Sequence, residues 1–188
     1  MKLNFLLIIL LPIFTFALCL WNPTQRFVGE DMPINKGVED VPCLISDDDE
    51  FFYAFGVGDP ATAIRSAQSF MSHKLSCIYS VIIHDYSRQM GIGEDSFSSQ
   101  HREDVGEQVI KATIDVAREL CRQISRDEYG NILMYVTISV SKKEFVNDLV
   151  QKISEDEQLK VHFDEKTFRD SAIKILREFN ERKDSNNQ

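Results

Sequence analysis

The sequence predicts an α+β domain with a mainly antiparallel sheet of about four strands, packed by helices, and a helical C-terminal extension. Two β-prone runs support this class: the aromatic run 51–57 and the β-branched run 132–140, ILMYVTISV. Apolar residues at helical spacing fill much of the chain between and after them. The order of these segments lacks the regular strand–helix repeat of a doubly wound parallel sheet.

Residues 1–17 predict a secretory signal peptide. Lys2 supplies the positive start, 3–14 is almost wholly apolar, and 15–17 forms a cleavage site with small side chains at Thr15 and Ala17. The apolar run is shorter than the roughly 20 residues that span a bilayer, and Pro12 interrupts it. We therefore expect export, to the periplasm or to the outer membrane and cell surface.

Cys19 is the candidate lipid-attachment residue, because a cysteine directly after a signal core can be the acylated first residue of a lipoprotein. Such sites normally carry a small residue just before the cysteine, whereas this chain has Leu18. A plain exported protein and a protein anchored by an N-terminal lipid are both open.

Residues 18–49 are predicted to be a flexible tether, since prolines and glycines interrupt them. The tether ends in the acidic run 47–50, DDDE. This run lacks the spaced ligands and the central glycine of a calcium loop, and we interpret it as solvated charge.

The folded domain is expected over 50–183, starting with the strand 51–57. Gly56 and Gly58 predict a tight structural turn that lets a helix pack on this strand. Asp59 is placed to cap that helix, and Pro60 suits its first turn. The predicted core face of the helix is Ala61, Ile64, Ala67, Met71 and Leu75. The run 77–86, CIYSVIIHDY, is β-branched and aromatic and predicts a second strand.

The middle of the chain is predicted in outline. Residues 88–100 contain glycines and a serine cluster and suggest a mobile loop, and 103–113 suggests a helix. The segment 114–125 could continue that helix or form a strand. Since 127–131 is a turn, a strand there would make a hairpin with 132–140, the clearest strand in the chain.

Two helices are predicted after the hairpin. Ser141 caps the first, and Glu144 three residues later completes a capping box. The second covers about 164–182, and residues 184–188 are expected to be a disordered tail. The predicted buried faces are Phe145, Leu149, Val150 and Ile153, followed by Phe168, Ala172, Ile175, Leu176 and Phe179.

Composition limits the partners. The formal net charge is −9, from 30 acidic and 21 basic residues. An acidic surface disfavours nucleic acid and anionic membrane faces, which carry charge of the same sign.

Four cysteines do not make a disulfide scaffold in a chain of this length. Cys77 and Cys121 fall in predicted structured segments and could form a disulfide in an oxidising compartment. The alternative is two buried thiols that behave as small hydrophobes. Cys43, in the tether, has no evident partner except Cys19.

The segment 56–61 matches the dinucleotide-binding pattern G-x-G-x-x-A, between a strand and a helix. Asp59, however, would place a negative charge beside a pyrophosphate, and Pro60 removes a backbone N–H from the helix N-terminus that would bind it. We interpret Gly56 and Gly58 as a structural turn, and predict no nucleotide and no other cofactor.

No catalytic or metal site is predicted. The histidines lack ligand spacing, although His101 lies near Glu103, and His73 and His84 could converge if the first helix packs beside the second strand. Cysteines in apolar runs have raised thiol pKa values, which disfavours a nucleophile. Asp85 and Asp127 are conceivable as paired carboxylates, but nothing fixes their separation. The protein is predicted not to be an enzyme.

Arg118 and Arg122 share one face of the segment 114–125 if it is a strand, and could bind an anionic partner or a glycan. Such residues more often form the solvated face of a half-exposed strand.

The order of strand, Gly-x-Gly turn, alanine-containing helix, strand, helix and Gly-Asn hairpin resembles the bacterial LPP-twenty-like family of small envelope lipoproteins. The matching residues are Tyr53-Ala54-Phe55-Gly56-Val57-Gly58, Ala61, Ala63, Ala67 and Tyr135-Val136-Thr137-Ile138. The resemblance covers about 51–141, half of the chain. It implies an envelope-associated α+β domain of no known catalytic activity. Leu18 departs from the family's lipidation pattern.

The expected function is therefore that of an exported, non-catalytic cell-envelope protein, an assembly or interaction module with unidentified envelope proteins as partners. The alternative is a periplasmic module that binds a small ligand or glycan between the sheet and the 88–100 loop. A degenerate hydrolase is a third reading.

Overall fold

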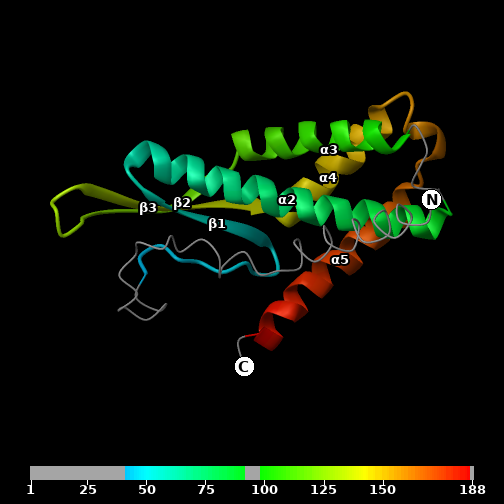
Figure 1. Cartoon of the computed structure of the whole chain (residues 1–188). Helices are drawn as coiled ribbons and strands as arrows, with labels where there is room; N and C mark the ends of the chain where they lie inside the picture. Colours follow the sequence, from blue (N-terminus) through cyan, green and yellow to red (C-terminus); the bar gives the residue numbers. More distant parts are fainter. Residues whose placement is uncertain (1–40, 92–97, 187–188) are drawn as a thin grey trace, which may run out of the picture. The chain divides into compact units, whose positions relative to one another are not determined.

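The computed structural model describes residues 41–91 and 98–186, and confirms the α+β class. Residues from Pro42 onward form one compact unit. The elements, shown in Figure 1, are β1 (Phe51–Gly58), α2 (Pro60–Met90), α3 (Ser98–Asp115), β2 (Arg118–Arg126), β3 (Ile132–Ser141), α4 (Lys142–Glu155), the 3-10 turn η3 (Lys160–His162) and α5 (Glu165–Asn186).

Within the described residues the sheet has three antiparallel strands in the order β1-β3-β2, one strand fewer than expected. In the central strand, Val136 lies opposite Gly56 and Arg122, and these residues point toward the face that α2 covers. Thr137 lies opposite Phe55 and Cys121 on the other face. Both faces of β3 are buried, which explains its continuous apolar sequence.

The predicted strand at 77–86 is wrong, because α2 continues through it as one helix of 31 residues. Its fully buried residues recur every three or four positions, which is the period of a helix. At about 1.5 Å per residue the helix is roughly 46 Å long. Burial along this one stripe overrides the local β-propensity of the segment. The buried stripe comprises Ala63, Ala67, Met71, Leu75, Ile78, Ile82 and Tyr86.

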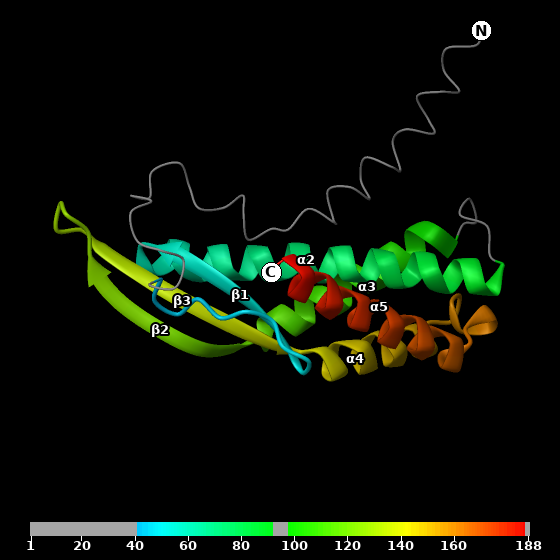
Figure 2. The same cartoon turned by 90° about the horizontal axis from the view of Figure 1, so that it is seen from below.

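The first half of α2 packs on β1 and β3, and the second half packs on α3 and α5 (Figure 2). The two backbones come very close at Gly56. A Cβ atom there would lie 2.0 Å from the carbonyl oxygen of Ala63 and 2.7 Å from the amide nitrogen of Ala67. The turn then uses Gly58, whose φ of +149° suits glycine. The predicted structural role of both glycines agrees with this geometry.

Asp59 and Ser141 cap α2 and α4 as predicted, while the reciprocal bond of a capping box, from the Ser141 amide to the Glu144 side chain, is not among the hydrogen bonds of the described residues. The Asp59 carboxylate accepts hydrogen bonds from the amides of Ala61 and Thr62, at 3.0 and 3.2 Å. The Ser141 hydroxyl accepts one from the amide of Glu144 at 3.3 Å.

The structure decides the ambiguous segment 114–125. Helix α3 ends at Asp115 and strand β2 begins at Arg118, so the β2–β3 hairpin exists. The Asp127 carboxylate organises the turn by accepting from the amides of Tyr129 and Asn131, and Gly130 takes a left-handed φ of +84°. Of the predicted loop 88–100, both ends are helical and 92–97 lies outside the described residues.

The C-terminal helices complete the core beside the sheet. Phe145, Leu149 and Phe168 are fully buried, and the Phe163, Phe168 and Tyr86 rings pack with centroids 5.5–6.1 Å apart. Helix α5 extends to Asn186, so the start of the predicted disordered tail is helical.

Residues 42–49, which we call the strap, belong to the folded unit. Cys43 forms a disulfide with Cys121 of β2, with the Cα atoms 5.5 Å apart, and the Thr137 hydroxyl donates to the Cys43 carbonyl. The strap therefore lies over the sheet face opposite α2. The tether prediction is wrong for these residues, and its part up to residue 40, with Cys19, lies outside the described residues, as does the predicted signal.

The possible disulfide between Cys77 and Cys121 does not form, because Cys121 pairs with Cys43. Cys121 lies opposite Thr137 on the sheet face turned away from α2, whereas Cys77 belongs to α2 itself. Cys77 is nevertheless disulfide-bonded, so the alternative of two buried thiols fails as well.

Replacing Gly56 with alanine is expected to lower the free energy of unfolding by about 3 kcal/mol, because the new methyl group meets backbone atoms that cannot move independently. Urea denaturation of the oxidised chain measures this. Gly130→Asn is the control: it lies at the hairpin tip with open space, and asparagine tolerates a left-handed φ. Equal stability of the two variants would contradict the close packing of α2 on β1.

Candidate functional site

The outer edge of β1 is closed at Tyr53 by side chains of the strap and of α2. The Asp47 carboxylate accepts a hydrogen bond of 2.6 Å from the Tyr53 amide. The Lys74 ammonium donates to the Tyr53 carbonyl at 2.5 Å and forms an ion pair of 2.9 Å with Asp47. The backbone of Tyr53 is therefore satisfied on the side away from β3, and another strand cannot pair there.

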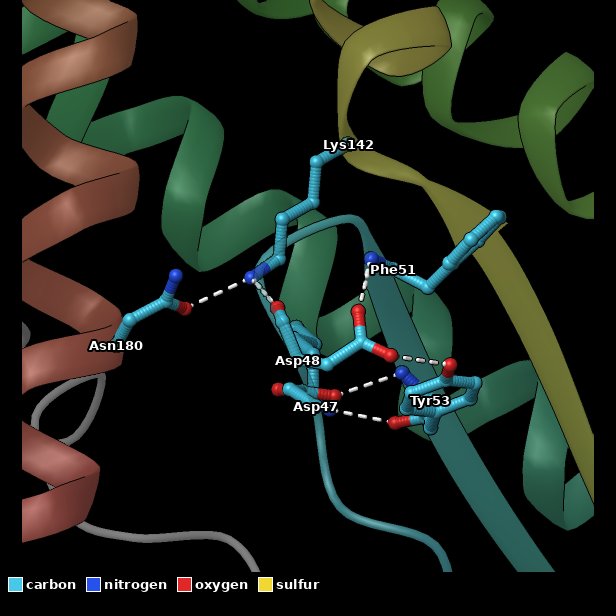
Figure 3. Close-up of polar contacts among 7 residues, drawn as sticks. Asp47, Asp48, Phe51, Tyr53, Lys142 and Asn180 are labelled. Atoms are coloured by element: carbon cyan, nitrogen blue, oxygen red, sulfur yellow. Dashed lines mark hydrogen bonds and ion pairs between the residues drawn. The ribbon is translucent and has the colours of Figure 1, made fainter.

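Asp48 fixes the start of β1 (Figure 3). One carboxylate oxygen accepts from the amides of Glu50 and Phe51 at 2.8 and 2.7 Å, and the other accepts from the Tyr53 hydroxyl at 2.7 Å. The bond from Tyr53, together with the amides, lowers the pKa of Asp48. The same bond raises the pKa of Tyr53 to about 12, since losing the phenol proton would place two negative charges together.

Lys142 joins the strap to both C-terminal helices. Its side chain is buried, and its ammonium donates to the Asp48 carbonyl and, at 2.7 Å, to the Asn180 side chain (Figure 3). The Phe52 ring lies 5.0 Å from the same nitrogen. Asn180 in turn donates to Asp49 at 3.0 Å. Residues 48–50 are exposed, as expected of solvated charge, but Asp47, Asp48 and Asp49 also hold specific partners, which the sequence did not predict.

The outer edge of β2 is different. Among the described residues, the hydrogen bonds of its backbone run to β3 and leave the other side without a partner strand. Most of its side chains are exposed, including Leu120 at 54% and Ile124 at 60%. We use the name β2 edge for this open side of the strand, Arg118–Arg126, with its exposed side chains.

A bulge between Glu119 and Cys121 sets where the arginines point. Arg118 lies opposite Ser139 and Arg122 lies opposite Val136, so the two point to opposite faces of the sheet. The expectation that they share a face is wrong, because the extra residue shifts the alternation. Arg122 forms an ion pair with Glu119 at 2.5 Å, and Arg126 donates to the Gly130 carbonyl at 2.8 Å.

The histidines do not converge. His73 and His84 both lie on α2, eleven residues and about 16 Å apart along its axis. The His101 Nε2 atom lies within hydrogen-bonding distance, 2.9 Å, of the Asp156 carboxylate, so the partner of His101 is Asp156 instead of Glu103. Among residues 41–91 and 98–186, no cluster of His, Cys, Asp and Glu has the arrangement of a metal site.

Asp85 and Asp127 are not brought together. Asp127 lies in the hairpin turn, and Asp85 lies in the distal half of α2, where Lys174 of α5 donates to it at 2.7 Å and Arg88 at 2.9 Å. Burial tends to raise the pKa of Asp85, but the bonds from Lys174, Gln89 and Ser171 outweigh it and lower the pKa. This carboxylate ties α2 to α5.

The amides that follow the glycine turn, at the start of α2, already have a hydrogen-bond acceptor from the protein itself. The Asp59 carboxylate already accepts from the N-terminal amides of α2, which a phosphate would need. Its pKa is lowered, with the Thr62 hydroxyl as the largest cause.

No helix of the described residues is long and apolar enough to cross a bilayer. No known protein family, curated protein or solved structure matches this chain. The resemblance to LPP-twenty-like proteins therefore stays a prediction.

Removing the Cys43–Cys121 bond through Cys43→Ser with Cys121→Ser is expected to cost about 4 kcal/mol of unfolding free energy. The bond joins residues 78 positions apart, and loop closure of that length restricts the unfolded chain. Urea denaturation and amide exchange of the strap measure the effect. Changing both cysteines leaves no new thiol for exchange with Cys77. Unchanged stability and strap protection would refute the bracing role.

Asp48→Asn is expected to bring the pKa of Tyr53 from about 12 down toward its ordinary value near 10. In the parent chain the raised pKa contributes stability that is complete below pH 10 and is lost as the pH rises through 12. The lowered pKa of Asp48 contributes stability above about pH 4, lost as the pH falls.

The ultraviolet difference titration of each chain against its Tyr53→Phe variant measures this pKa. The control is Asp127→Asn, which also removes a carboxylate of lowered pKa but has no tyrosine hydroxyl bonded to it. An unchanged Tyr53 titration in Asp48→Asn would rule out the proposed cause.

Proposed function

We propose that the protein is an exported, non-catalytic interaction module of the bacterial cell envelope. The observation that carries this is the Cys43–Cys121 disulfide in a chain whose first 17 residues have the pattern of a secretory signal. Disulfides persist in oxidising compartments such as the periplasm, and are rare in the cytosol. Cys77, also disulfide-bonded, adds to the same argument.

The contrast between charged side chains that hold the fold together and the exposed residues of the β2 edge favours an interaction role. Lys74, Lys142, Asp85 and the strap aspartates are engaged in holding elements together. The β2 edge, by contrast, combines exposed apolar side chains, arginines and open backbone groups. It is the part of the described surface with features suited to another polypeptide.

The small-ligand alternative has less support. Its cavity was expected between the sheet and the 88–100 loop, but the sheet lies at one end of α2 and residue 90 at the other (Figure 1). The Tyr86 and Phe168 rings fill the core near that distal end. We therefore favour a protein partner, with envelope proteins as the class to test.

Attachment to a membrane through a lipid on Cys19 is the further part of this proposal. It would make the protein an anchored envelope lipoprotein, and the mass measurement below tests it.

The test is expression of the full chain in a bacterium with an oxidising periplasm, followed by acid quenching, thiol alkylation and intact mass of each cell fraction. We expect a mature chain without residues 1–17, with Cys43 and Cys121 protected from alkylation until reduced. Added acyl mass in the membrane fraction would identify the lipid anchor. Peptide mapping without reduction identifies the bond of Cys77.

A chain lacking residues 2–17 is the matched control, since it stays in the cytosol and its cysteines should alkylate. If the full chain keeps residues 1–17, remains in the cytosol and has Cys43 and Cys121 reduced, the proposal of export is wrong.

A further inference from the structure

We infer that the β2 edge binds an extended acidic segment of a partner protein, which adds to the sheet as a fourth strand. This inference rests on the proposed function, and names the surface and the chemistry of its partner.

The first argument is the contrast between the two sheet edges. At β1, Asp47 and Lys74 occupy the outward amide and carbonyl of Tyr53. At β2, no side chain or segment among the described residues plays this part. Strand addition supplies partners to just such a row of backbone groups, and it gives affinity through main-chain hydrogen bonds.

The second argument is the side-chain pattern of β2 after its bulge. Arg122, Ile124 and Arg126 all point to the same face of the sheet as Val136 of β3. Helix α2 packs on this face over β1 and β3, at the other side of the sheet from the β2 edge. An added strand with acidic residues opposite the arginines and an apolar residue opposite Ile124 would match this sequence. Opposite charges and apolar pairs across neighbouring strands are each stabilising.

Charge decides between possible occupants. A second copy paired along the whole of β2, centred on Arg122, would place Arg122 opposite itself and Arg118 opposite Arg126. Like charges directly opposite each other destabilise a strand pair. An acidic segment meets Arg122 and Arg126 on one face of β2, and the strand carries three arginines against one glutamate, whereas the protein as a whole, at net charge −9, repels such a segment.

Edge arginines and bulges also discourage unspecific strand pairing, so binding has to be shown to use the backbone. The probe is the blocked peptide Thr-Glu-Thr-Val-Thr-Glu-Thr, whose side-chain order is the same in either direction. Its glutamates can face Arg122 and Arg126 while valine faces Ile124. Titration into the oxidised, isotope-labelled chain, followed by amide chemical shifts, gives the affinity and the place of binding.

We expect shift changes centred on β2 and at least tenfold weaker binding of the same peptide with lysine in place of glutamate. Two further peptides carry N-methyl groups either on the threonines or on the other three residues. An added strand turns alternate amides toward its neighbour. One methylated peptide should therefore lose at least tenfold in affinity and the other should keep it.

Arg122→Glu is expected to lower the affinity of the chain for the glutamate peptide at least fivefold and to raise its affinity for the lysine peptide. Arg177→Glu is the matched control, with the same charge change at an exposed position of α5. Arg122→Gln is a second variant, which removes the positive charge without adding a negative charge beside Glu119. Its affinity for the glutamate peptide should fall by a smaller factor than that of Arg122→Glu.

Equal affinity of both methylated peptides would mean that the peptide binds through side-chain charge without backbone hydrogen bonds, and would overturn strand addition. No binding of the glutamate peptide, or a dimer through β2 in sedimentation, would overturn the acidic partner. Neither result bears on export and oxidation of the chain, which the mass measurement reads separately, so the two proposals can fail independently.

Discussion

The close contact between α2 and β1 at Gly56 is the constraint on which the rest of the fold depends. Because no side chain separates the two backbones there, the first half of α2 lies directly on the sheet, with Ala63 and Ala67 at the contact. The helix can then continue past the sheet, and its second half becomes the support for α3 and α5. A helix held farther from the sheet could not bury the same stripe along its whole length.

The opposite face of the sheet is completed by the strap instead of a second helix. A covalent bond at Cys43 and the polar contacts of Asp47 and Asp48 hold this short segment in place. Lys142 then makes the strap, α4 and α5 mutually dependent, because its buried charge needs acceptors from the strap and α5.

A three-stranded sheet has two edges, and this molecule treats them differently. The strap closes the first half of the β1 edge as a consequence of where Cys43 is anchored, since the aspartates after it reach Tyr53 and Lys74. The β2 edge carries a bulge and arginines, and none of residues 41–91 and 98–186 pairs with its outward backbone groups. The same disulfide therefore braces β2 from the strap side without using that edge.

The sequence by itself determined the α+β class, the glycine turn, the caps at Asp59 and Ser141 and the hairpin turn at 127–131, because these depend on neighbours within a few residues. Only the tertiary structure decided that 77–86 is helical, since burial along α2 overrides local β-propensity. It also decided the partner of Cys121 and the role of the acidic run, which depend on residues brought together from far along the chain. The faces of Arg118 and Arg122 depended on one bulged residue, a detail of pairing with β3 that alternation in a single strand cannot reveal.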